Sequence, residues 1–141
     1  MTVALSGIAQ RGFDTAEFAR RCASAQAVMA TLNLGAVLLA SEAEIRYFTG
    51  FMTQFWQSPT RPWFLVVPAT GRPIAIIPEI GAALMAETWI DDIRSWSSPH
   101  ASDDGIGMLA DVLRPFSRVG MPMGRESSLR MPLGDLHRLQ D

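Results

Sequence analysis

The chain has 141 residues and a formal net charge of −2, with 48% hydrophobic and 18% charged residues, a composition that excludes an intrinsically disordered protein. Its length suits one domain, residues 1–141, with a core of its own. All 12 basic residues are arginines and they form no stripe, which excludes nucleic acid and anionic membranes as partners and also excludes lysine-based chemistry.

The first predicted element is a helix that begins after Asp14, the expected N-cap, with Glu17 completing a capping box. Apolar residues then follow helical spacing along one face; they are Phe18, Cys22, Ala25, Met29 and Leu32. Cys22 is the single cysteine and lies on this face, so we expect a buried, inert thiol. A chain without disulfides is expected in the cytoplasm, and no apolar run approaches the ~18 residues of a membrane span.

A strand and a second helix are expected next. Residues 36–40 form an unbroken apolar run, which is typical of a strand buried on both faces in a largely parallel sheet. Ser41 and Glu44 form a second capping box, which predicts a short helix that stops at Gly50. The order up to this point is helix, strand, helix.

The middle of the chain is predicted to form a hairpin. Residues 63–67 and 73–77 are apolar runs joined by the turn sequence Ala69-Thr70-Gly71-Arg72, so the two strands are expected to pair antiparallel. A short helix after Pro78 and a further strand over residues 90–96 follow. The sheet is therefore expected to be mixed.

The last third of the chain continues the alternation. It is expected to hold a helix capped by Asp103 or Asp104, a short strand at residues 118–121 and a last helix that starts with Pro132. That helix runs to Asp141 without a C-cap glycine, which predicts a domain cut from a longer protein. The whole pattern predicts an α/β fold, a three-layer α/β/α sandwich around a mixed, mostly parallel sheet.

No complete catalytic constellation is present in the sequence. His100 and His137 lack metal-ligand spacing, and no phosphate-binding glycine loop or nucleophile elbow occurs. The acidic pairs Asp91-Asp92 and Asp103-Asp104 are expected to be helix caps and solvated edges. We therefore predict no catalytic residue, no metal site and no cofactor in this chain.

Aromatic residues concentrate in the segment 47–68. Most of them suit a core, but Phe55 and Trp56 precede a loop with two prolines and are expected to be difficult to bury. Arg61 lies in the same loop. Large aromatic side chains beside an arginine are typical anchors of protein interfaces, so use at a partner site and use in the core are both open for these residues.

Several segments together resemble the creatinase/prolidase N-terminal domain, and the resemblance covers essentially the whole chain. They are the leading helix with Phe18 and Arg20, the strand 36–40, the segment Glu44-Ile45-Arg46-Tyr47-Phe48-Thr49-Gly50-Phe51, the strand 63–68 and the run 74–78. The Tyr-Phe-Thr-Gly-Phe element is the most specific of these. The resemblance implies a fold of the ribonuclease H-like, creatinase N-terminal type.

In that family the domain precedes a metallohydrolase domain, in which two Asp, one His and two Glu bind a pair of divalent metal ions. The relatives include Xaa-Pro dipeptidase, aminopeptidase P, creatinase and enzymes that degrade osmolytes, such as dimethylsulfoniopropionate lyase relatives. None of that second domain is present in this sequence. The resemblance implies that the chain works with its own C-terminal catalytic domain, in a homodimer, on a small-molecule or dipeptide substrate.

Family dimers place a loop of this domain at the active site of the partner subunit, and in creatinase the loop supplies an aromatic residue and an arginine. Arg61 falls at the arginine position, whereas Pro59 falls at the aromatic position, which departs from the pattern. Trp56 or Phe55 would then serve instead. Three hypotheses follow: a non-catalytic cap of a hydrolase, a free-standing module that binds a small ligand, and a purely structural dimerisation domain.

Overall fold

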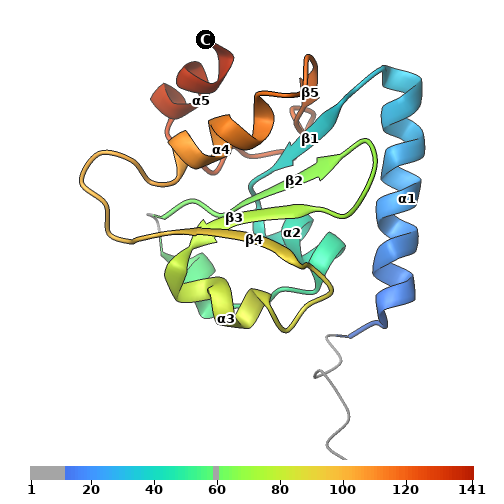
Figure 1. Ribbon diagram of the computed structural model, residues 1–141, viewed down its shortest axis with the longest axis horizontal. Coiled ribbons are helices and arrows are strands. Elements are labelled where there is room, and N and C mark those ends of the chain that lie inside the picture. Colours follow the sequence, from blue (N-terminus) through green and yellow to red (C-terminus); the bar gives the residue numbers. More distant parts are fainter. Residues whose placement is uncertain (1–11, 59–60) are drawn as a thin grey trace, which may run out of the picture.

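The computed structural model describes residues 12–58 and 61–141 and contains one five-stranded sheet in the order β4-β3-β2-β1-β5 (Figure 1). The strands are β1 (Ala36–Leu39), β2 (Phe64–Pro68), β3 (Ile74–Pro78), β4 (Asp92–Trp96) and β5 (Val119–Gly120). The α-helices are α1 (Thr15–Leu32), α2 (Glu42–Thr49), α3 (Ala82–Met85), α4 (Ile106–Leu113) and α5 (Leu133–Gln140). Two short 3-10 helices, η1 (Gln54–Gln57) and η2 (Glu79–Gly81), precede β2 and α3. The expected α/β class is confirmed.

The sheet is mixed, as the predicted hairpin requires. Strand β2 pairs antiparallel with both β1 and β3, whereas β1 pairs parallel with β5 and β3 pairs parallel with β4. Within the described residues the two directions are therefore equally represented, in contrast to the mostly parallel sheet that we expected. An apolar run shows that a strand is covered on both faces, but burial alone does not fix the direction of its neighbours.

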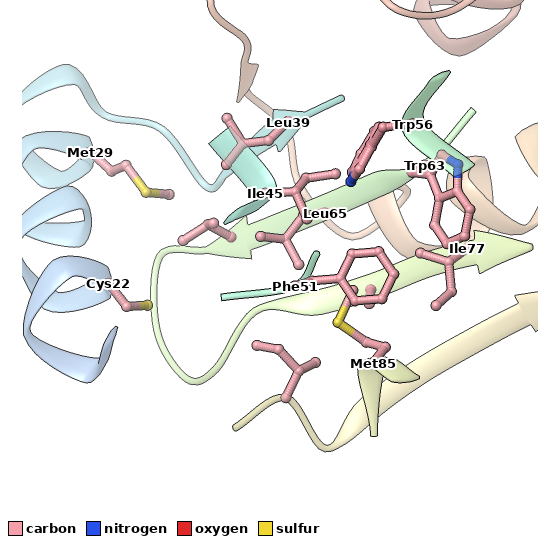
Figure 2. Packing of buried hydrophobic residues seen from close by; sticks show 13 residues of the cluster. Cys22, Met29, Leu39, Ile45, Phe51, Trp56, Trp63, Leu65, Ile77 and Met85 are labelled. Carbon is pink, nitrogen blue, oxygen red and sulfur yellow. The ribbon is translucent and has the colours of Figure 1, made fainter. Parts of the chain in front are cut away.

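Side chains of the central strands alternate between two cores, one on each face of the sheet. One core joins Leu39, Leu65 and Ile77 to residues of α1, α2, η1 and α3; the helical members are Cys22, Met29, Ile45, Trp56 and Met85 (Figure 2). The other core joins Leu38, Phe64 and Ile76 to α4, which contributes Ile106, Leu109 and Val112. Helices thus cover both faces of the sheet, with α4 on the opposite side from α1 and α3 (Figure 1).

The predicted N-caps Asp14 and Ser41 are confirmed. The capping box expected at Asp14 is formed only by the Asp14 side chain, because the Glu17 carboxylate binds Arg20 and Arg21. Asp14 accepts a hydrogen bond from the backbone N–H of Glu17 at 2.9 Å. Ser41 and Glu44 form the reciprocal capping box at the start of α2, and Gly50 ends α2 in the left-handed conformation that glycine adopts without strain. These ends are set by residues within four positions of each other, which is why the sequence predicts them well.

The side chain of Arg21 links α1 to α2. Its guanidinium lies 4.4 Å from the ring centroids of both Phe13 and Tyr47, and it donates a 2.9 Å hydrogen bond to the Tyr47 carbonyl oxygen. Glu17 accepts hydrogen bonds from Arg20 and Arg21, which lower the pKa of Glu17 to about 2. An ionised Glu17 therefore holds Arg21 in position between the two helices.

We expect Glu17→Gln to lower the melting temperature at neutral pH but not in strong acid. The pKa of Glu17 is lower in the folded chain, about 2, than its ordinary value of 4.5, so its contribution is present above pH 4.5 and is lost as the pH falls toward 2. Thermal unfolding of both proteins from pH 7 to pH 2 measures this difference. A difference that stayed constant over this range would show that ionisation of Glu17 does not stabilise the fold.

Candidate functional site

The loop between α2 and β2 is an aromatic loop, which we define as residues 54–58 and 61–62. It begins with η1, whose N-cap Thr53 accepts a hydrogen bond from the N–H of Phe55 at 3.2 Å. Successive residues of a 3-10 helix point about 120° apart, so this single turn sends its two aromatic side chains in different directions. Phe55 is 36% exposed, whereas Trp56 is only 7% exposed.

Trp56 belongs to the core, so the expectation that it is difficult to bury is wrong. Its ring centroid lies 5.7 Å from that of Trp63, which in turn lies 5.5 Å from that of Phe51 (Figure 2). Such tilted aromatic pairs stabilise a core beyond the area that they bury. The stack explains three of the seven aromatic residues of segment 47–68, and Phe64 is buried in the other core. Phe55 remains the aromatic side chain of the loop that faces solvent.

Arg61 is half-buried and has a φ of 66°. This left-handed conformation costs a residue with a Cβ about 1–2 kcal/mol. Among the described residues, no carboxylate forms an ion pair with the Arg61 guanidinium. The loop therefore holds a strained arginine whose charge is not neutralised by the part of the chain that the structure describes.

Arg130 contacts the loop from the segment before α5. Its Nη2 donates hydrogen bonds to the carbonyl oxygens of Ser58 at 2.7 Å and Trp56 at 3.2 Å, and its Nη1 donates to the carbonyl of Arg61 at 3.3 Å. The guanidinium also lies 5.0 Å from the Trp56 ring centroid. Sequence reasoning missed Arg130, because it lies about 70 positions from its partners and no local pattern marks it.

The first acidic pair lies on the surface, as predicted. Asp91 forms an ion pair with Arg72 at 3.1 Å, and Asp92 forms one with Arg94, also at 3.1 Å. All four side chains are well exposed, and exposed ion pairs of this kind contribute little to stability. The pair marks a solvated edge of the sheet at the start of β4.

The prediction that Asp103 or Asp104 is the N-cap of α4 is wrong, because the N-cap residue is Gly105; Asp103 instead binds the first turn of the helix from two positions further back. Both carboxylate oxygens of Asp103 accept the N–H of Gly107 at 3.1 Å, and His100 Nδ1 accepts the N–H of Asp103 at 3.0 Å.

Burial raises the pKa of the Cys22 thiol, as expected for an inert cysteine. Residues 12–58 and 61–141 contain no group of three or more His, Cys, Asp and Glu that could hold a metal ion.

A groove of about 810 Å³ lies between α4, β5 and α5. Its lining is mainly apolar and includes Leu113, Phe116 and Leu139, together with the charged residues Arg114 and Arg138. The aromatic loop does not line this groove.

No helix in the described part of the chain is both long and apolar enough for a transmembrane segment.

Comparison with protein-family models matches residues 21–141 to the creatinase/prolidase N-terminal domain. The chain belongs to this family. The match covers the aromatic loop, its Arg130 contact and every residue of both cores, and it leaves out residues 15–20 of α1. No match was found among the curated proteins.

Solved structures of dipeptidases share the fold of this family member. Dipeptidase PepE from Mycobacterium ulcerans is 25% identical with a TM-score of 0.67; the alignment covers 91% of this chain but only 34% of that protein. This chain thus spans about a third of the length of the dipeptidase. Other matched structures are single N-terminal domains of such enzymes.

The creatinase/prolidase N-terminal domain of an X-Pro dipeptidase from Streptococcus pyogenes is 14% identical, with a TM-score of 0.67 and 86% of each chain covered. The N-terminal domain of Xaa-Pro dipeptidase from Lactobacillus brevis is 19% identical, with a TM-score of 0.66, 84% of this chain covered and 87% of that chain. These likenesses at low identity show a shared fold.

The aromatic stack leaves no room for a side chain at Gly81. A Cβ at this position would lie 2.6 Å from Cη2 of the Trp63 ring, so we expect Gly81→Ala to lower the free energy of unfolding by about 1–3 kcal/mol. Denaturant unfolding measures this loss. The control is Gly134→Ala in α5, where no atom lies within 4 Å of the new Cβ; it is expected to leave stability unchanged or to raise it by up to about 1 kcal/mol.

The left-handed backbone of Arg61 predicts an unusual order of stability among variants at this position. Arg61→Gly is expected to be more stable than Arg61→Ala by about 1 kcal/mol, because glycine adopts a φ of 66° without strain. At Arg125, an exposed position without a positive φ, the order is expected to be reversed, with the alanine variant more stable. Thermal unfolding of the four variants measures both differences. Equal stability of the two Arg61 variants would show that the backbone at Arg61 is not strained.

Proposed function

We propose that this chain is the non-catalytic N-terminal domain of a metal-dependent Xaa-Pro peptidase or creatinase-like hydrolase. In this proposal the domain forms a homodimer contact and its aromatic loop caps the active site of the partner subunit. The reaction itself takes place in a C-terminal metallohydrolase domain of the same polypeptide, in the cytoplasm. The fold is then a three-layer sandwich of the ribonuclease H-like, creatinase N-terminal type.

The observation that carries the proposal is the placement of Phe55 and Arg61. One is an exposed aromatic ring and the other is a guanidinium without a described carboxylate partner, and both lie on a loop anchored to the core through Trp56. Interface anchors are typically aromatic residues and arginines held on a rigid scaffold. Trp56, the third residue that we expected at the partner site, supports the loop from inside.

A guanidinium offers the chemistry that a small zwitterionic substrate or a dipeptide requires. Arg61 can hold a carboxylate with two parallel hydrogen bonds, and Phe55 can contact the apolar part of the substrate or a cationic group. Neither residue can break a bond in a peptide, so their role is to bind and orient. In this proposal the domain contributes specificity, and the metal ions are held by the C-terminal domain.

The proposal predicts that Arg61 acts across the dimer. In the longer hydrolase, Arg61→Gln is expected to lower kcat/KM about 10–100-fold, because a charge-assisted hydrogen bond to the substrate is lost. The crossed test co-expresses subunits carrying Arg61→Gln with subunits that lack a metal ligand. Activity should recover to about a quarter of wild type, because half of the dimers are mixed and each mixed dimer has one complete site.

Each outcome of the crossed test decides one part of the proposal. Recovery supports a cap supplied by the partner subunit, whereas no recovery would mean that Arg61 serves the active site of its own subunit. Full activity of the Arg61→Gln enzyme would reduce the domain to a structural dimerisation role. The control is Arg125→Gln, which changes an exposed arginine outside the aromatic loop and should keep wild-type kcat/KM.

A further inference from the structure

We propose that Arg130 is a positioning residue that holds the aromatic loop in the conformation which presents Phe55 and Arg61 to the partner. The proposal rests on the function proposed above for the loop. It assigns a role to a residue outside the loop, on the segment that precedes α5. Arg130 contacts the loop backbone, so its effect on a substrate would pass through the loop.

The contacts of Arg130 link both sides of the loop. Two carbonyl oxygens, those of Trp56 and Ser58, belong to the end of η1, and the third belongs to Arg61, just before β2. One guanidinium therefore fixes the distance between the two described halves of the loop. Because it also lies over the Trp56 ring, it is itself held in place by a residue of the core.

The shape of the arginine side chain is what these contacts require. A guanidinium carries five N–H donors in one rigid plane and can bind three carbonyl groups at separate positions. A lysine ammonium is a compact charge on a flexible stem and cannot reproduce this arrangement. We therefore expect that a positive charge at position 130 is not sufficient and that Lys will not replace Arg130.

The Arg130 guanidinium donates its hydrogen bonds to the aromatic loop. Burial lowers the pKa of Arg130, and the Glu42 carboxylate opposes this shift from beyond ion-pair distance. A partly desolvated cation without a direct ion pair gains from hydrogen bonds to carbonyl dipoles. Within the described residues, every hydrogen bond that this side chain donates goes to the backbone of the aromatic loop. These bonds therefore serve to order that loop.

The loop has amides that report on its conformation. The N–H of Phe55 is bound to the Thr53 side chain, that of Trp56 to the Thr53 carbonyl, and that of Ser58 to the Phe55 carbonyl. Opening of η1 would release all three and speed their exchange with deuterium. Hydrogen exchange of the loop can thus be compared with that of the central strands in the same molecule.

The first experiment measures hydrogen exchange of the 141-residue chain with Arg130, Arg130→Lys, Arg130→Gln and the control Arg125→Gln. We expect peptides that cover η1 to exchange about tenfold faster in both Arg130 variants, while peptides from β2 and β3 stay protected. The control should match wild type throughout. Unchanged exchange of η1, or equally faster exchange of the central strands, would overturn a local positioning role.

The second experiment measures kcat/KM of the longer hydrolase with Arg130→Lys, with Arg61→Gln and with both. If Arg130 acts through the loop, the double variant should lose little more than Arg61→Gln alone, because the two residues then serve one contact. Additive losses would overturn that link. Faster loop exchange combined with wild-type kinetics of all three enzymes would uphold the positioning of the loop by Arg130 and refute the proposed cap.

Discussion

Burial of the three central strands on both faces is the constraint from which the rest of the architecture follows. Strand β2 is buried along its whole length, from Phe64 to Pro68, and its neighbours β1 and β3 are nearly so. Side chains of a strand alternate between faces, so each face of this sheet presents a continuous apolar surface that needs a cover. Helices α1 and α3 supply it on one face and α4 on the other.

The aromatic loop is a consequence of how the chain reaches β2. After α2 the chain must return to the middle of the sheet, and it does so over the end of one core, which Phe51, Trp56 and Trp63 fill together. The same turn that places Trp56 inside leaves Phe55 outside. Trp56 thus anchors the loop in the core, and the cap proposed above requires that this anchor hold the binding groups at a fixed place.

The family membership of the chain and the chemistry of its side chains both agree with the proposed non-catalytic role. The chain belongs to the creatinase/prolidase N-terminal domain family, and the described residues contain no cluster of three or more potential metal ligands. In the function proposed above, Arg61 binds the substrate and the domain influences the reaction through geometry. On that proposal its contribution depends on how firmly the loop is held, so Arg130 would affect the reaction without contacting the substrate.

The sequence by itself determined the α/β class, the helix caps at Asp14 and Ser41 and the hairpin of β2 and β3, because each depends on residues close together in the chain. Only the tertiary structure decided the balance of parallel and antiparallel pairs, the burial of Trp56 and the contact of Arg130 with the loop. These depend on segments far apart in the chain, and hydrophobic periodicity shows which side of an element is buried without showing what covers it.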